Sequence, residues 1–160
     1  MIKLNPNQIR TSVATMVLAA STLVGIAVHE GYKDEAYIPV AGDVPTIDFG
    51  RTKGVKMGDK SNPVRGLQLL LNEVDSVYAQ GVRRCITAPM FQYEFAASVS
   101  ISYNIGVKAF CGSTIAKRFN AGDYAGACAA FDMWNKQGGR VLPGLVKRRA
   151  EERAICEGRA

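Results

Sequence analysis

Residues 29–50 read HEGYKDEAYIPVAGDVPTIDFG and mark the point where the chain changes its structural character. An apolar run ends at Glu30, and the glycines and prolines that follow it break any helix. Residues 36–38 and 44–47 are typical of short strands. Beyond residue 60, apolar residues recur at steps of three and four, which predicts helices. The sequence therefore predicts an α+β fold, with a small β-hairpin lobe at about 32–58 and a mostly helical lobe at about 61–157.

Several helix starts are visible in the second lobe. Ser61-Asn62-Pro63 places a proline in the first turn, where its missing N–H is not needed. The apolar periodicity that follows predicts a long helix ending near Gly81. Further starts are predicted at 87–89, at Ser113, at Asp123 and at Pro143.

Composition and charge narrow the classes of function. The 160 residues suit one domain or two small lobes that share a core. A formal net charge of +6 favours anionic partners without choosing among them. The single histidine, His29, excludes a zinc site built from two or three histidines. The basic run 147–149 alternates with Glu151 and Glu152, which is typical of a mixed solvated face, so we expect no nucleic-acid partner.

An uncharged segment runs from Thr11 to Val28 and follows two cations, Lys3 and Arg10. As one helix it would be about 27 Å long, close to the hydrocarbon thickness of a bilayer. The positive flank predicts that the rest of the chain is exported. Its many Ala, Ser, Thr and Gly residues make it a weak anchor. Two alternatives stay open: a signal peptide cleaved near residues 19–21, and a core helix of a soluble protein.

Four cysteines lie far apart in the sequence. Their spacing does not match a zinc ribbon or a redox motif. Reduced thiols in a cytosolic protein are one interpretation, but an exported chain favours two disulfides, for which three pairings exist. The four are Cys85, Cys111, Cys128 and Cys156.

Glu30 is the first acidic residue of the chain and follows an apolar helix. A carboxyl held against apolar surface is suited to general-acid chemistry, although a charge that merely marks a helix end is the simpler interpretation. The glycine-rich turns are expected to bring Asp43 and Thr46 back toward Glu30. An acid, a second carboxylate and a hydroxyl that converge on a cleft could carry out glycoside hydrolysis.

The order of these motifs resembles the bacteriophage-type lysozymes, glycoside hydrolase family 24. Residues 29–32, 36–37 and 44–50 are similar to that family's Glu-Gly, Tyr and Thr-Ile-Gly-x-Gly signature. Residues 91–95, 103–106, 120–124, 134–139 and 142–149 follow in the family order. The resemblance covers nearly all of residues 29–154.

This resemblance implies a lysozyme-like fold with the active site in a cleft between the lobes. It also implies a cofactor-free, metal-free muramidase that cuts between N-acetylmuramic acid and N-acetylglucosamine. Glu30 would be the acid and Thr46 would lie near the attacking water. The family's aspartate falls at Pro39 here, so Asp43 is the candidate replacement. Asp48 stands where the family favours glycine, and its role is left open.

Three residues further along are candidates for substrate binding, namely Gln92, Asn104 and Trp134. Each has an alternative structural role: the two amides could satisfy the backbone, and the tryptophan could be a core aromatic.

The weak apolar helix before the glutamate resembles the signal-arrest-release endolysins. That likeness implies a monomer held at the inner membrane, inactive until the segment 1–28 is released into the periplasm to join the catalytic domain at 29–160. In this setting we expect the disulfides Cys85–Cys156 and Cys111–Cys128, each joining neighbouring helices. The alternative function is a non-catalytic wall-binding or lysis-accessory protein on the same scaffold, which Pro39 and Asp48 favour.

Overall fold

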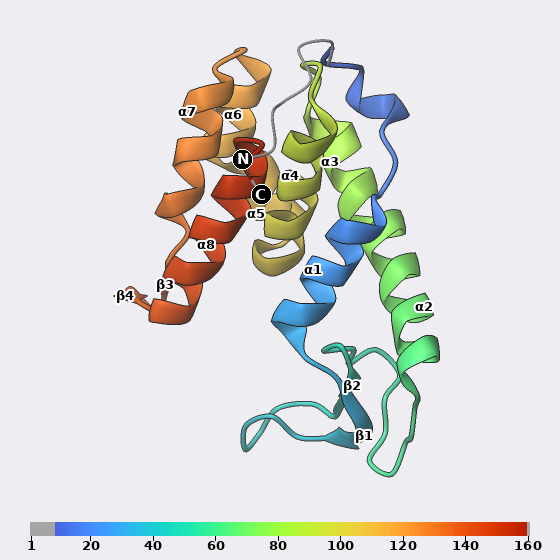
Figure 1. The fold of residues 1–160 in the computed structure, drawn as a ribbon. Helices are drawn as coiled ribbons and strands as arrows, with labels where there is room; N and C mark the ends of the chain where they lie inside the picture. The colour runs from blue at the N-terminus through green and yellow to red at the C-terminus, as the bar shows by residue number, and fades with distance from the viewer. Residues whose placement is uncertain (1–8, 160) are drawn as a thin grey trace.

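The computed structural model describes residues 9–159 and shows a helical lobe above a small β-lobe (Figure 1). Helix α1 (Ala20–Glu30) leads from the helical lobe into the β-lobe, and α2 (Pro63–Glu73) returns from it. The predicted fold class is confirmed.

The apolar segment 11–28 is not one continuous helix. A short 3-10 turn, η1 (Val13–Thr15), precedes an extended stretch that ends where α1 begins. Val13 and Met16 are buried in the main core, and Thr11 exchanges two backbone hydrogen bonds of 2.9 Å with Met90. These contacts compete with helix formation and hold the stretch extended. Within residues 9–159, no helix combines the length and apolarity needed to cross a membrane.

The β-lobe is an antiparallel pair, β1 (Lys33–Tyr37) and β2 (Thr46–Asp48). Lys33 lies opposite Asp48 and Tyr37 opposite Thr46, with an irregularity between the two pairs. A cluster of Ala36, Ile47 and Val55 is all that this lobe buries for itself. So small a core cannot stabilise an independent domain, and the lobe depends on the helices beside it.

The long helix begins where the sequence predicts. The Asn62 side chain accepts a hydrogen bond of 3.0 Å from the N–H of Arg65 and caps α2. The helix continues through η2 (Val74–Ala79), a π-helical stretch, into α3 (Gln80–Cys85). The predicted end near Gly81 is therefore wrong. Gly81 lies inside the helix, and Val107 packs directly on its backbone, so the glycine there serves close packing and not a helix end.

We expect Gly81→Ala to destabilise the protein by about 2 kcal/mol, because the new methyl group would overpack this contact. An ideal Cβ at Gly81 would lie 2.5 Å from a methyl carbon of Val107. Gly25→Ala is the matched control, since a Cβ there meets nothing within 4 Å and the change favours the helix by about 1 kcal/mol. Urea unfolding of both variants gives the comparison, and equal effects would contradict the packing argument.

The central helix α4 (Gln92–Ile105) begins later than residues 87–89, where the sequence predicted it. The side chain of Asn120 accepts the N–H of Thr87 at 2.8 Å and so ties up the preceding turn. The Glu94 side chain then accepts the N–H of Phe91 at 2.8 Å and closes the first turn of α4. The long-range contact of Asn120 and the local closure by Glu94, rather than the proline, set this boundary.

The remaining elements complete the helical lobe. Ser113 and Asp123 cap two of them as predicted, through their side-chain oxygens. The last helix begins at Pro143, also as predicted. These elements are α5 (Val107–Gly112), α6 (Thr114–Asn120), α7 (Tyr124–Ala129), η3 (Ala130–Met133), the hairpin β3 (Lys136–Gln137) and β4 (Arg140–Val141), and α8 (Pro143–Cys156).

Two disulfides are present, and their pairing differs from the expected one. Cys85 is joined to Cys111 and Cys128 to Cys156, with Cα–Cα distances of 5.6 Å in both. The expectation was wrong because it placed the wrong helices side by side. The end of α3 packs on α5, and α7 packs on α8, so each cysteine meets a partner fewer than 30 residues away.

Candidate active site

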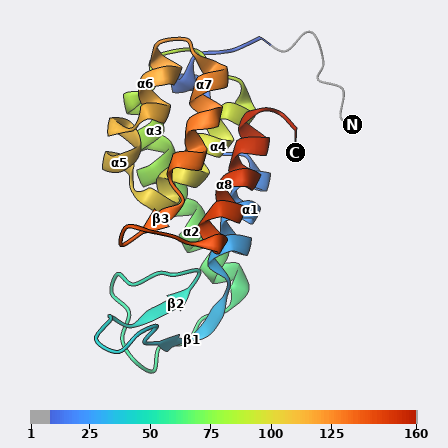
Figure 2. The ribbon, with the colours of Figure 1, turned by 90° about the vertical axis from the view of Figure 1, so that its left-hand side faces the viewer.

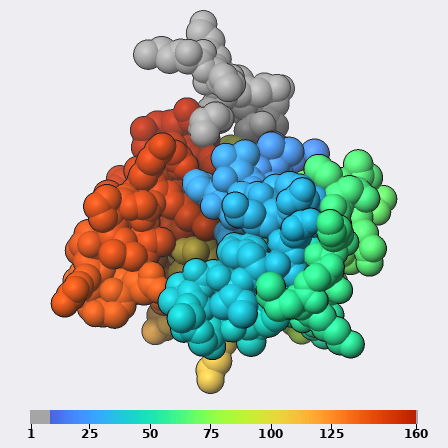
Figure 3. Space-filling view, turned by 90° about the horizontal axis from the view of Figure 1, so that it is seen from below, coloured from blue at the N-terminus to red at the C-terminus, as the bar shows by residue number. Residues whose placement is uncertain are grey.

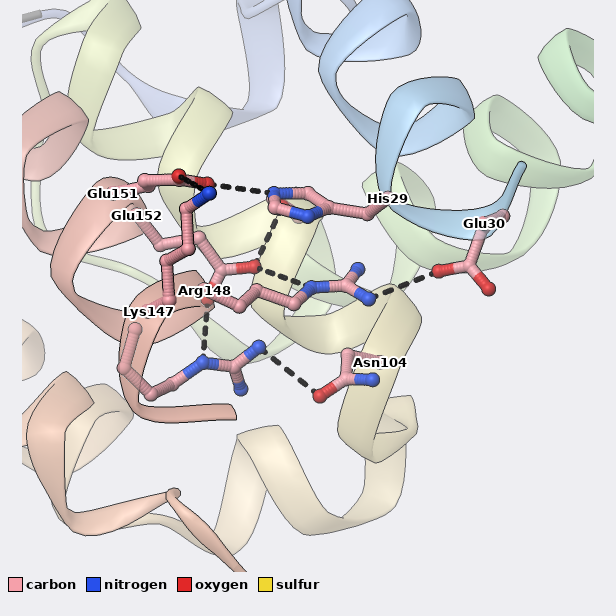
Figure 4. A network of polar contacts seen from close by, with 9 residues as sticks. His29, Glu30, Asn104, Lys147, Arg148, Glu151 and Glu152 are labelled. Atoms are coloured by element: carbon pink, nitrogen blue, oxygen red, sulfur yellow. Dashed lines mark hydrogen bonds and ion pairs between the residues drawn. The ribbon is translucent and has the colours of Figure 1, made fainter. Parts of the chain in front are cut away.

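Glu30 is the last residue of α1, at the junction of the two lobes. Gly31 follows it with a φ of 70°, a conformation that favours glycine and turns the chain into β1. The Glu30 carboxylate contacts Arg148 of α8, with 3.0 Å between Oε1 and Nη1, and its side chain is 24% exposed (Figure 4). The helix end thus presents a carboxylate that solvent can reach and that a cation holds on one side.

A buried group of charges lies behind this contact. Glu152 Oε1 accepts hydrogen bonds from Arg148 Nε at 3.3 Å and from Ser100 Oγ at 2.7 Å. Its other oxygen lies 2.9 Å from Nε of Arg149. Burial raises the pKa of Glu152, against the opposing effect of the two arginines and Ser100, and burial lowers the pKa of Arg149. We call Arg148, Arg149 and Glu152 the α8 charge cluster.

The β-lobe approaches Glu30 through the turn that follows β2. An ideal Cβ built on Gly50 would lie 3.8 Å from Glu30 Oε2. The Tyr103 hydroxyl of α4 donates to the carbonyl of Phe49 at 3.3 Å and ties this turn to the helical lobe. Burial, and then the negative charge of Glu30, raise the pKa of Tyr103. The turn, the central helix and α8 therefore surround one carboxylate.

The lower surface of the molecule is hollowed. Seen from below, a depression separates the β-lobe from the segment that contains β3 and β4, and α4 residues form its floor (Figure 3). The β3–β4 hairpin lies at the lower end of the helical lobe, above the β-lobe (Figure 2). A separate cavity of about 420 Å³ lies between α1, α4 and α8, with His29 and Glu152 in its wall.

The other two predicted catalytic residues are placed differently from Glu30. Thr46 is buried in β2, and its hydroxyl donates to the Val44 carbonyl at 3.1 Å. Asp43 is exposed in a turn, where its N–H donates to the Val40 carbonyl at 2.9 Å. Among the hydrogen bonds and ion pairs of the described residues, none joins Asp43 to Glu30. The catalytic role of Asp43 stays a prediction.

Asp48 points into the protein. It is 3% exposed, has a φ of 59°, and pairs with Arg51 at 3.0 Å. Its other oxygen lies against Gly66 of α2, 3.0 Å from where a Cβ would stand. Asp48 is therefore a buried carboxylate at the contact between the β-lobe and α2, paired within its own lobe.

The candidate substrate-binding residues fall into two groups. Asn104, at the end of α4, is exposed and accepts a hydrogen bond of 3.0 Å from Arg149, which places it beside the α8 charge cluster (Figure 4). Trp134 is half-buried and packs on the main core. Gln92 is at the opposite end of α4 and donates to the Val17 carbonyl at 2.9 Å. The structure does not bring Gln92 to the site.

Sequence reasoning missed the α8 charge cluster. It predicted a solvated face for residues 147–152, which holds for Lys147 and Glu151 but not for the three members of the cluster, whose exposed fractions are 8%, 1% and 1%. The signal was present in their spacing, because positions 148, 149, 152 and 156 share one helix face and Cys156 is a core residue. No group of three or more His, Cys, Asp or Glu suited to a metal ion occurs in residues 9–159.

Comparison with known proteins identifies the family. The family model described as phage lysozyme matches residues 27–152, a stretch that contains Glu30 and the α8 charge cluster. The chain belongs to the phage lysozyme family. Among relatives of this phage lysozyme, the SAR-endolysin of Pseudomonas phage phiKMV is 38% identical over 141 residues, covering 86% of this chain and 86% of that protein.

Other relatives agree. An endolysin from Acyrthosiphon pisum secondary endosymbiont phage 1 is 36% identical over 89% of this chain and 99% of its own length. The solved endolysin from Escherichia coli O157:H7 phage FAHEc1 superposes with a TM-score of 0.79 at 37% identity, over 89% of this chain and 94% of that one. The protein is therefore a phage lysozyme of the SAR-endolysin kind, a glycoside hydrolase that degrades peptidoglycan.

Proposed function

We propose that this lysozyme hydrolyses the β-1,4 bond between N-acetylmuramic acid and N-acetylglucosamine, with Glu30 as the general acid. The observation that carries the proposal is the position of Glu30: a solvent-accessible carboxylate that ends the helix leading into the β-lobe and that contacts Arg148 of α8. A protonated carboxyl there can give its proton to the leaving oxygen, and an activated water completes hydrolysis. Thr46 lies in the neighbouring strand and would act near that water.

The test is the chemistry of the new chain ends. Purified protein is incubated with isolated Gram-negative peptidoglycan, and the fragments are analysed by mass spectrometry. We expect new reducing N-acetylmuramic acid ends. Reducing N-acetylglucosamine ends, or anhydro-muramic acid ends, would contradict the proposal by showing another bond or another reaction. Binding without cleavage would support the alternative, a non-catalytic wall-binding protein.

Asp43→Asn should retain most of the activity. Its carboxylate is exposed in a turn and shows no contact with Glu30 among the described residues, so the structure offers less support for Asp43 as the replacement carboxylate than for Glu30 as the acid. A change of less than about threefold in turbidity clearance is expected, a difference of about 0.6 kcal/mol in barrier height. A loss near that of a Glu30 variant would restore Asp43 to the mechanism.

Membrane retention before release is the second part of the proposal. The similarity to SAR-endolysins and the positive flank of segment 11–28 support it. In the described conformation the extended stretch 16–19 and α1 pack on the helical lobe, as a released segment would. Fractionation of cells that express the full chain tests this: we expect it in the membrane pellet, then in the periplasm after depolarisation. A soluble periplasmic product at all times would overturn retention.

A further inference from the structure

Glu152 is a glutamate almost completely removed from water. It is 1% exposed and contacts two arginines and one serine. Burial of a charge is unfavourable unless it is paired and hydrogen-bonded, and here three partners supply that compensation. Arg148 also donates a hydrogen bond to Glu30, and Arg149 also donates one to Asn104 (Figure 4). One buried carboxylate, Glu152, therefore contacts both arginines, and each arginine in turn contacts a candidate site residue.

The charges around Arg148 and Arg149 are paired with one another. Arg148 contacts both Glu30 and Glu152, and Arg149 contacts Glu152. If Glu152 lost its charge, Glu30 would be the one remaining anion in contact with Arg148 among the pairs described, and Arg149 would lose its counter-charge. An opposite charge in contact with a carboxyl favours the ionised form. An ionised Glu30 cannot donate a proton to a leaving oxygen.

The remaining groups around Glu30 do not replace this balance. Tyr103 of α4 and Tyr78 of η2 are close enough for the charges of Glu30 and Glu73 to raise the pKa of each, after burial as the first cause. Tyrosines at neutral pH carry no charge, and Glu73 of α2 adds a negative one. On α1 itself, Nε2 of His29 lies 3.4 Å from Oε2 of Glu151. Glu151 belongs to α8, as Arg148 does.

We infer that Glu152 is a positioning residue for the reaction: it fixes and neutralises Arg148 and Arg149, so that Glu30 is held in place yet remains able to carry a proton. The inference rests on the proposed function, in which Glu30 is the acid. Glu152 touches no reacting atom and acts only through the arginines.

The decisive variant is Glu152→Gln, which keeps the shape and removes the charge. In the pH profile of peptidoglycan cleavage, the alkaline limb follows loss of the proton from the acid. We expect this limb to move to lower pH by about one unit in E152Q, which is about a tenfold loss of rate above the limb. A variant that was merely less well folded would lower the whole profile without moving the limb.

Glu151→Gln is the matched control. Glu151 is the adjacent residue of α8, is 46% exposed, and contacts Lys147 and His29. Solvent screens an exposed charge, so we expect its limb to shift by less than about 0.3 units. An equal shift of the limb in E151Q and E152Q would overturn the inference. It would show that the shift comes from the change in the protein's net charge and not from the contacts of Glu152.

A second variant covers the case in which E152Q does not fold, since Arg149 would lose its buried counter-charge. Ser100→Ala removes only the 2.7 Å hydrogen bond that Glu152 accepts and changes no charge. We expect a smaller shift of the limb in the same direction. The inference would be overturned if the limb did not move in folded S100A and did not move in E152Q, where that variant folds.

Carbon-13 NMR of the Glu30 carboxyl gives a readout independent of catalysis. We expect its titration midpoint to fall in E152Q and to stay near the wild-type value in E151Q. If wild-type protein cleaves no peptidoglycan, the proposed function fails, while this titration still tests the role of Glu152. If cleavage is normal and the midpoint does not move, only the inference about Glu152 fails.

Discussion

Glu30→Gln is expected to lower the rate of peptidoglycan cleavage by about 100- to 10,000-fold, the range for removing a positioned general acid. The amide cannot donate a proton to the leaving oxygen in the same way, although its size and its contact with Arg148 Nη1 can be kept. Turbidity clearance at equal protein concentration measures the loss. Circular dichroism should show the same fold in both proteins.

Glu35→Gln is the matched control for this change. Glu35 lies on β1, five residues further along, and makes an exposed ion pair of 2.7 Å with Lys60. An exposed pair of this kind contributes about 0–1 kcal/mol to stability, so activity should be close to the wild-type value. If Glu30→Gln retained more than about a tenth of the activity, Glu30 would not be the general acid.

The second large effect is expected in stability. Replacing both Cys128 and Cys156 with alanine removes a link that closes 28 residues between α7 and α8, and should cost about 3–4 kcal/mol. Both residues are buried, so the loss of packing adds to this. For a chain of this size the Tm would fall by about 10 °C. Calorimetry under oxidising conditions measures it.

Peptide mapping of the non-reduced wild type provides the control for that experiment. Fragments that join Cys85 to Cys111 and Cys128 to Cys156 are expected. A fragment that joins Cys85 to Cys156 would contradict the structure and would return the pairing to the one expected from the sequence. In that case the double alanine variant would remove both disulfides and leave Cys85 and Cys111 as free thiols.

Local signals in the sequence located many elements correctly. The helix starts predicted at residues 61–63, Ser113 and Asp123 are confirmed, because at each a side-chain oxygen and a free N–H lie within three residues of each other. The β-lobe was predicted because prolines and glycines forbid helix over residues 39–58. Glu30 stood out because no acidic residue precedes it.

Interactions between distant segments account for the errors. Gly81 was predicted to end a helix, but it lies inside one, where the close packing of Val107 requires a residue without a side chain. Segment 11–28 read as one helix, but pairing between Thr11 and Met90 holds part of it extended. Arg149 and Glu152 read as solvated charges, but α4 covers them. In each case the deciding partner is more than 25 residues away or on another helix.

The α+β class, the order of the lobes and the candidate acid could be predicted from local patterns, because they follow from short-range periodicity, capping and an ordered set of motifs. The disulfide pairing, the exposure of Asp43 and the burial of Glu152 beside two arginines became visible in the folded chain alone. Such features depend on which helix faces meet across the core. That is a property of packing in three dimensions, and no local pattern encodes it alone.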